Sequence, residues 1–400
     1  MMRTFTALMA IVALSSCLLS GCATSVATGS ASKPNLPVPW RDDSFAYAPE
    51  LVRLKQADLF VLPPDLQEKI VGSVQAGSPT SARLKQMMVV LFGKDLLIYP
   101  YASGHSTAVA QTWNNKRGDC ISITMLAYAV AKEMNIDAQM QEVYTPTLFD
   151  RRNHIDFING HVNLLVKNST EFEITNKTLS AHDFVIDFEP EQKVFLEGTA
   201  LSEAAIAARF YNNLGAEYLA NNQTALAYAY FKQAVLTDPR FEKSYTNLAQ
   251  LYKSRQLLAD AENMLLYALS IAPKSETTLH SLMELMAEQK RTSEQQYYAT
   301  LLQESQKNDP YYWLAMGIDQ LKQQRYKDAI ASLKQAKQMT HGFDEVHANL
   351  ALAYWRDQQP EKAREELAIL AELQPGSQRV SALNAKFQTP AKVTDAATAK

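Results

Sequence analysis

The second half of the chain repeats a pattern of small, aromatic and apolar positions every 34 residues. The first two copies match at six positions: Leu214, Tyr218, Ala227, Phe231, Ala234 and Pro239 against Leu248, Tyr252, Ala261, Leu265, Ala268 and Pro273. Two further copies keep the register over 313–336 and 350–375, and the copy at about 276–309 is degenerate, with Met283 and Gln295 replacing small residues. Paired helices approach closely only at small side chains, so the pattern predicts an all-α solenoid of about five units over 204–380.

The middle of the chain, residues 45–203, lacks this period and mixes helical with strand-like patterns. Apolar residues three or four positions apart predict helices at 64–74 and 81–92. A third, mostly apolar stretch begins at Cys120, directly after Asp119, whose carboxylate suits the N-cap position. We expect this helix to be central and buried. The sulfur of Cys120 would then lie at the positive end of the helix dipole, which favours the thiolate.

Short runs of β-branched and aromatic residues predict strands later in the same region. They lie at 138–144, 161–166 and 184–188, with a short additional strand at 172–175. The segment 145–159 is interpreted as a loop, either a substrate lid or ordinary surface. Helices followed by strands within one segment indicate an α+β domain.

The first 44 residues lack the periodicity of a folded domain. Residues 1–21 hold one cation, Arg3, then an apolar run and small residues, which is the layout of a secretory signal peptide. The run LSGC ending at Cys22 resembles the bacterial lipobox, and this resemblance implies cleavage before Cys22 and lipidation of its thiol. The alternative is an ordinary signal peptide with a chance cysteine. Residues 22–44, rich in Ser, Ala, Thr and Pro, predict a flexible tether.

Ala23 follows the lipidated position, where retention in the inner membrane would call for Asp. By resemblance to Gram-negative lipoproteins, this residue favours sorting to the outer membrane. We therefore expect a protein that is held at the bacterial outer membrane by acyl chains and faces the periplasm.

Composition and charge narrow the function classes. With 400 residues, 47% of them hydrophobic and 20% charged, the chain is long and apolar enough for more than one core. The 39 Lys and Arg residues are outnumbered by 42 Asp and Glu residues, so there is no general basic surface for nucleic acid, which we do not expect as a partner. The last residues, 381–400, predict a disordered tail.

The three cysteines have different fates in this interpretation. Cys17 is lost with the signal peptide and Cys22 is blocked by lipid, which leaves Cys120 without a disulfide partner. In an oxidising compartment an unpaired thiol is either buried or used, so Cys120 is a candidate nucleophile with a buried structural cysteine as the alternative. One thiol and scattered histidines give no HExxH or CxxC spacing, so we expect no metal and no other cofactor.

The middle region resembles the transglutaminase-like superfamily of papain-like cysteine enzymes, whose core follows the order Cys, His, Asp. Most of the resemblance lies in TAVAQTWNNKRGDCISITMLAYAVAKEMNIDAQ, with GHVNLLV and VIDFEP supplying the rest. It implies an α+β transglutaminase-like/papain-like domain with Cys120, His161 and Asp187 as catalytic residues. Two departures stand out: no Trp follows His161, and the long interval from His to Asp leaves Asp183 as a rival.

The resemblance also implies a role for each residue. His161 would take the proton of Cys120, and the resulting thiolate would attack a carboxamide or peptide carbonyl to form a thioester. Asp187 would orient His161. The oxyanion would be stabilised by the backbone N–H of Cys120 and by one upstream amide, for which the candidates are Gln111, Asn114 and Asn115. Three other histidines are rival bases, although none is followed by an apolar strand after a glycine: His105, His154 and His182.

The 34-residue unit resembles the tetratricopeptide repeat. In such repeats the first helix of each pair projects side chains to the concave face, and an asparagine recurs there at one register position: Asn213, Asn247 and Asn349. Their amides could bond an extended peptide backbone and so line a binding groove. The alternative is a solvated helix face.

Combined, the resemblances indicate a bacterial lipoprotein with a transglutaminase-like domain followed by tetratricopeptide repeats. We expect a cysteine-dependent amide hydrolase or acyl transferase that acts on protein or peptide substrates bound partly by the repeats. The main alternative is a non-enzymatic envelope scaffold whose repeats recruit partner proteins. A third hypothesis is a peptidase or amidase of peptidoglycan peptides.

Overall fold

The computed structural model describes most of the chain after residue 37. The described residues are 38, 40–73, 78–93, 99–100, 102, 106–143, 149–152, 155–158, 160–167, 172–174, 177–179, 184–187, 198–340, 342–373 and 378–388. Several predictions lie outside them: the signal segment 1–21, Cys22, most of the tether, Asp183, His105, His154, His182 and the tail from 389.

Short 3-10 helices and four α-helices precede the strands. They are η1 (Asp43–Phe45), η2 (Pro49–Leu51), η3 (Gln56–Asp58), α1 (Pro64–Ser73), α2 (Thr80–Phe92), α3 (Val109–Asn115) and α4 (Cys120–Glu133). The helices predicted at 64–74 and 81–92 are confirmed, and α4 begins at Cys120 as predicted. Every residue from Cys120 to Ala127 is buried, so α4 lies at the centre of a hydrophobic core.

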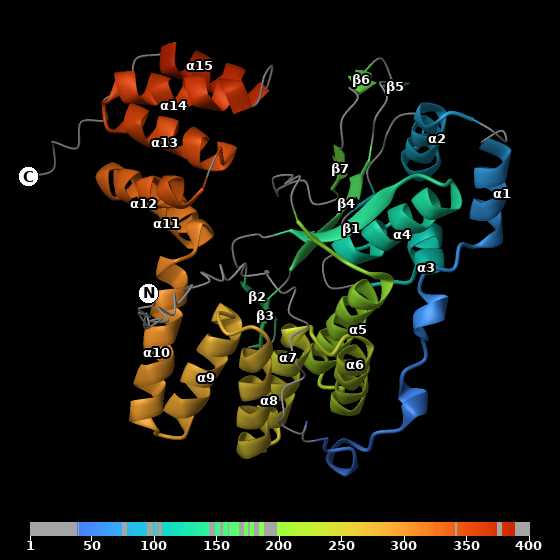
Figure 1. Cartoon of the computed structure of the whole chain (residues 1–400). Helices are drawn as coiled ribbons and strands as arrows, with labels where there is room; N and C mark the ends of the chain where they lie inside the picture. Colours follow the sequence, from blue (N-terminus) through green and yellow to red (C-terminus); the bar gives the residue numbers. More distant parts are fainter. Residues whose placement is uncertain are drawn as a thin grey trace, which may run out of the picture. The chain divides into compact units, whose positions relative to one another are not determined.

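Four antiparallel strands form the sheet against which α4 packs (Figure 1). Their order is β7 (Phe184–Ile186), β4 (His161–Val166), β1 (Ala138–Val143) and β8 (Thr199–Ala200). The first residue of β4, His161, lies opposite Val143 in the β1–β4 register. The apolar residues Met140, Leu164 and Val166 belong to the core around α4. Because side chains alternate along a strand, Gln141 and Asn163 lie on the opposite face of the sheet.

Two further pairs of strands lie in this region. They are β2 (Phe149–Arg152) with β3 (Ile155–Ile158), and β5 (Phe172–Ile174) with β6 (Lys177–Leu179). β5 confirms the strand predicted at 172–175. The β2–β3 hairpin corrects the prediction that 145–159 is only a loop. The strand was not recognised because Asp150, Arg151 and Arg152 interrupt the apolar alternation that signals a strand.

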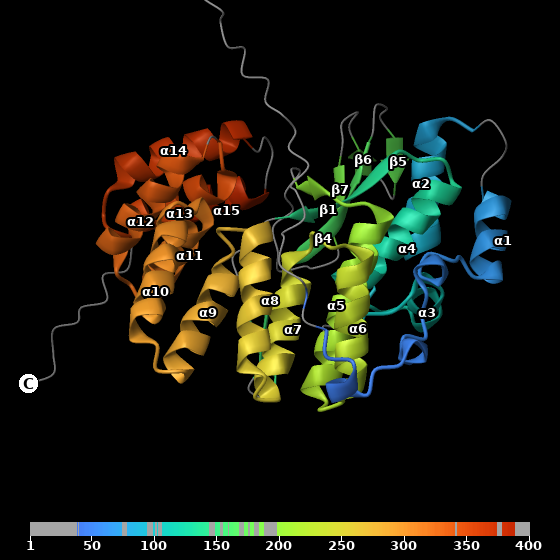
Figure 2. The ribbon, with the colours of Figure 1, turned by 60° about the horizontal axis from the view of Figure 1, so that its bottom comes forward.

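The remaining described helices form five antiparallel pairs and one single helix (Figure 2). The pairs are α5 (Glu203–Ala220) with α6 (Thr224–Thr237), α7 (Glu242–Ser254) with α8 (Leu258–Ile271), α9 (Glu276–Glu288) with α10 (Thr292–Lys307), α11 (Pro310–Lys322) with α12 (Tyr326–Met339), and α13 (Asp344–Arg356) with α14 (Pro360–Leu373). The single helix is α15 (Gln378–Gln388). It corrects the prediction of a disordered tail for residues 381–388, because Phe387 is buried there and stacks on Trp355 of α13.

The turn inside each pair repeats one backbone conformation. A residue with positive φ recurs every 34 residues, at Asn222, Gln256, Lys290, Gln324 and Gln358, with φ between 58° and 62°. The small positions are packed closely: a Cβ atom on Gly215 would lie 2.6 Å from the ring of Phe231. In the pair that departs from the repeat pattern, α10 has no buried residue. The pattern of small residues therefore does report where the helices cross.

The prediction of a flexible tether over 22–44 is wrong at its end, because residues 41 and 42 pack against the repeats. The Arg41 guanidinium donates to both carboxylate oxygens of Asp260 at 2.7 Å, and Lys232 donates to Asp42 at 2.7 and 2.8 Å. Just beyond 22–44, Phe45 is buried and stacks on Tyr228 with 4.7 Å between ring centroids. The sequence interpretation missed these contacts because the segment before residue 40 is rich in Ser, Ala, Thr and Pro, and only a few anchoring side chains follow it.

In the part of the chain that the structure describes, no helix has both the length and the apolar character needed to cross a bilayer.

Candidate functional site

The candidate nucleophile lies at the first turn of α4. The carboxylate of Asp119 accepts a hydrogen bond from the backbone N–H of Ser122 at 2.8 Å and from its hydroxyl at 2.6 Å, which confirms Asp119 as the N-cap. Cys120 follows directly and is 7% exposed. The cap therefore fixes the backbone of the first helical turn, which carries Cys120.

The candidate base and carboxylate lie on neighbouring strands. His161 begins β4, and Asp187 follows the last residue of β7. Leu164 pairs with Ile186 in the antiparallel register, which places Asp187 near the start of β4. The carboxylate oxygens of Asp187 lie 2.8 and 2.9 Å from Nε2 of His161, and both side chains are almost fully buried. The structure thus brings together His161 and Asp187, which lie 26 residues apart in the chain.

Two buried amides that the sequence interpretation missed extend this contact. The side-chain amide of Asn163 donates to Asp187 at 3.0 Å, and the amide of Gln141 donates to the oxygen of Asn163 at 3.0 Å. Asn163 stands two residues after His161, on the same face of β4, and Gln141 lies opposite it on β1. A polar residue inside the apolar run HVNLLV is the signal that could have identified Asn163.

His161 also acts on the thiol. Burial raises the pKa of Cys120, a hydrogen bond from His161 lowers it, and the negative charge of Asp119 raises it, with a net pKa above the ordinary value. This corrects the prediction that the helix dipole favours the thiolate, because burial disfavours the charged form and the capping carboxylate opposes the dipole. Since Asp187 contacts Nε2 of His161, the ring nitrogen that can take a proton from Cys120 is Nδ1, which is itself buried.

The N-cap carboxylate is held from a second direction. The hydroxyl of Ser106 donates to Asp119, and the amide of Asn213 on α5 donates to that hydroxyl at 3.2 Å. The backbone N–H of Ser106 donates to the carboxylate of Glu217, also on α5, at 3.3 Å. Ser106 thus links the first repeat helix to the start of α4.

The proposed oxyanion donors are not buried as Cys120 and His161 are. Gln111, Asn114 and Asn115 are all exposed on α3. Their role in stabilising an oxyanion stays a prediction, and the backbone N–H of Cys120 is the donor that α4 itself positions.

The three groove asparagines have partners within the chain. Asn213 donates to Ser106, as described, and Asn247 donates to the side-chain oxygen of Asn212 at 2.9 Å. Asn349 donates to the backbone oxygen and the carboxylate of Glu345 at 2.8 and 2.6 Å. Their contact with a bound peptide stays a prediction, and it would have to use the remaining capacity of each amide.

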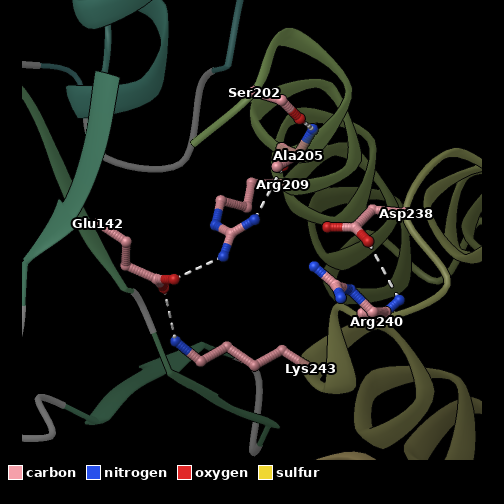
Figure 3. Close-up of polar contacts among 7 residues, drawn as sticks. All are labelled: Glu142, Ser202, Ala205, Arg209, Asp238, Arg240 and Lys243. Atoms are coloured by element: carbon pink, nitrogen blue, oxygen red, sulfur yellow. Dashed lines mark hydrogen bonds and ion pairs between the residues drawn. The ribbon is translucent and has the colours of Figure 1, made fainter. Parts of the chain in front are cut away.

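A cluster of charges joins the sheet to the repeat helices (Figure 3). The carboxylate of Glu142, on β1, accepts from Arg209 on α5 and from Lys243 on α7, the latter at 3.2 Å. Burial raises the pKa of Glu142, but the charges of Lys243 and Arg209 outweigh it, so the pKa lies below its ordinary value. The sequence interpretation missed this cluster because Arg209 lies 67 residues, and Lys243 lies 101 residues, after Glu142 in the chain.

Among the described residues, no group of three or more His, Cys, Asp and Glu side chains has the arrangement of a metal site.

Two family models match the chain, both described as tetratricopeptide repeat, over residues 208–241 and 320–387. The chain contains tetratricopeptide repeats. The predicted helical solenoid is thereby confirmed, and the matches include α6 of the first pair and α12 to α14 of the last two pairs.

Several solved structures are similar to the repeat region. YrrB, described as a TPR protein with an unusual peptide-binding site, is 19% identical, with 45% of this chain and 91% of that chain covered and a TM-score of 0.24. PilF of Pseudomonas aeruginosa is 17% identical over 46% of this chain and 85% of its own, with a TM-score of 0.26. MamA is 14% identical over 46% and 96%, with a TM-score of 0.23. No curated protein matches the chain.

Proposed function

We propose that the tetratricopeptide repeats bind a protein or peptide and that Cys120 attacks an amide of the bound substrate. The observation that supports this proposal is the buried polar chain from Cys120 through His161 and Asp187 to Asn163. A structural cysteine needs neither an imidazole at its sulfur nor a carboxylate behind that imidazole. This chain of contacts supports the proposal of a transglutaminase-like cysteine enzyme, the class that the sequence resembles.

The proposed reaction has two steps. The sulfur of Cys120 attacks the carbonyl carbon while Nδ1 of His161 takes the thiol proton, and the backbone N–H of Cys120 stabilises the oxyanion. The amine leaves with the proton from His161, which yields a thioester. Water then attacks to release an acid, or an amine attacks to form a new amide, and in both cases the thiol regains its proton from His161. Asp187 keeps the imidazole oriented and stabilises its cation.

The raised pKa of Cys120 affects how this reaction would begin. Burial keeps the resting thiol protonated, so the nucleophile would form by transfer to His161 during attack. A substrate carbonyl that covers the sulfur also excludes water, which strengthens the contact of the imidazolium with Asp187.

A non-enzymatic scaffold is the second candidate, and one observation favours it. The family models match only repeat segments, and repeat surfaces of this kind serve to bind other proteins. The lipobox resemblance supports attachment through lipidated Cys22 at the outer membrane, facing the periplasm, for either candidate. The two differ in what they require of His161, because a scaffold does not need it near the thiol.

Alkylation of Cys120 separates the two candidates. Iodoacetamide is applied to the full chain at pH 8, and the rate of modification at Cys120 is followed by peptide mass spectrometry. The hydrogen bond and charge of His161 lower the pKa of Cys120 against burial, so His161→Ala should slow alkylation about tenfold. Asp187→Asn should slow it less, because the imidazole remains but loses its charged partner.

The matched control is His280→Ala, which removes a half-buried histidine on α9, far along the repeats from the candidate site. It should alkylate like the wild type. Thermal melting of each variant shows whether a change in rate reflects local unfolding. Equal rates for the wild type and a folded His161→Ala variant would reject the enzyme proposal and leave the scaffold.

A further inference from the structure

One helix of the first repeat contacts both halves of the candidate site. Arg209, Asn213 and Glu217 of α5 are spaced four residues apart, so their side chains lie along one stripe of the helix. We call these three residues the α5 stripe. Its ends are about 12 Å apart along the helix axis, at 1.5 Å per residue. A rigid element of this length can set the distance between two groups that it touches.

The first end of the stripe lies against the strand that begins with His161. The Arg209 guanidinium donates to Glu142, which stands one residue before Val143, the partner of His161 in the sheet. Gly160 lies against the same cluster, because a Cβ atom there would lie 2.6 Å from Oε1 of Glu142 and 2.9 Å from Nζ of Lys243. The charged side chains of Glu142 and Lys243 therefore pack closely against Gly160, the residue directly before His161.

Arg209 is itself immobilised. Its guanidinium donates to the backbone oxygen of Ala205 at 2.9 Å and lies 4.3 Å from the centre of the Phe241 ring (Figure 3 shows the contacts with Ala205 and Glu142). The planar fork of arginine makes these contacts together, so the position of α5 fixes the position of Glu142.

The second end of the stripe lies against the start of α4. Asn213 and Glu217 hold Ser106 from two sides, and the hydroxyl of Ser106 donates to the N-cap carboxylate of Asp119. Ser106 is 5% exposed and Asp119 is 3% exposed, so water cannot easily replace these bonds. Asp119 directly precedes Cys120.

We propose that the α5 stripe positions Cys120 relative to His161, so that the first tetratricopeptide repeat is part of the candidate active site. This inference rests on the proposed function and makes Arg209 and Asn213 positioning residues. It implies that a partner that shifts α5 on binding the repeats also changes the reactivity of the thiol, because α5 is hydrogen-bonded both to Glu142 and to Ser106.

The test follows alkylation of Cys120 as a function of pH in the full chain. Arg209→Ala removes the contact to Glu142, and we expect it to move the alkylation midpoint to higher pH and to slow the reaction at pH 8 about tenfold. Arg209→Lys keeps the charge and should recover part of the rate. The isosteric Glu142→Gln should slow the reaction about threefold. A role in stability alone would lower the melting temperature without moving the midpoint.

Arg291→Ala is the control. Arg291 pairs with Glu262 and Glu294 inside the repeats, so it removes a comparable ion pair that contacts neither half of the site. It should leave the midpoint unchanged. If Arg209→Ala does not fold, Glu142→Gln carries the test. Midpoints of Arg209→Ala and Glu142→Gln equal to that of Arg291→Ala would overturn this inference when His161→Ala still shifts the profile, whereas an unshifted His161→Ala would overturn the proposed function itself.

Discussion

Two equivalent helices at opposite ends of the repeats, α5 and α13, use one face for different neighbours. Arg209 of α5 and Glu345 of α13 are separated by four periods of 34 residues and so share one register position. Arg209 pairs with Glu142 of the sheet, whereas Glu345 accepts from Arg379 of α15 at 3.0 and 3.1 Å. The position is a docking point in both helices, and its charge is reversed to suit the neighbour.

The asparagine one turn further on gives the same contrast. Asn213 donates to Ser106, which belongs to the candidate site, whereas Asn349 donates within its own helix to Glu345. The repeat register therefore fixes where a side chain points, and the residue type decides what it holds. This is why one recurring asparagine does not define one function.

Charge reversal at the shared position is the strongest test of this contrast. Arg209→Glu places two carboxylates together in a largely buried cluster, and we expect it to lower the free energy of unfolding by about 3 kcal/mol. Glu345→Arg opposes Arg379 at a more exposed contact and should cost about 1 kcal/mol. Urea unfolding followed by circular dichroism measures both. Equal losses would mean that the two faces are not used differently.

Acid sensitivity sharpens the comparison between the two ends. Burial raises the pKa of Glu142 and of Glu366 on α14, but their cationic partners outweigh burial, so both pKa values lie below the ordinary 4.5. Each ionised carboxylate thus stabilises the fold fully above about pH 4.5, and the contribution is lost as the pH falls through the lower folded pKa. The stability gap between the wild type and Glu142→Gln, or Glu366→Gln, should narrow from pH 6 to pH 3. A constant gap would contradict the assignment of these ion pairs.

Removal of the shared asparagine should give the smallest effect. Asn213→Ala deletes a hydrogen bond between α5 and Ser106, and we expect a loss of about 1 kcal/mol. Asn349→Ala deletes only bonds within α13 and should cost about 0.4 kcal/mol. Unfolding curves recorded side by side test the order, and a larger loss for Asn349→Ala would reverse it.

Much of the fold follows from local patterns in the sequence. The start of α4 at Cys120, its N-cap Asp119 and the strand that begins at His161 were all predictable, because each depends on neighbouring residues. The repeat register was equally readable, since close helix crossings require small side chains at fixed intervals.

Other parts of the site depend on contacts between distant segments, which one sequence does not reveal. The link from Gln141 through Asn163 to Asp187 requires the β1–β4–β7 strand order. The pKa of Cys120 was predicted in the wrong direction because burial is set by the whole domain rather than by the helix end. The contacts of the α5 stripe likewise depend on how the first repeat meets the sheet.

The central claim is that Cys120 and His161 share a proton. Thiolate absorbance at 240 nm, taken as the difference between the wild type and Cys120→Ser across a pH titration, measures the ionisation of this one thiol. We predict a wild-type midpoint below that of His161→Ala, because the imidazole stabilises the thiolate against burial. Coincident midpoints in two folded proteins would contradict the account.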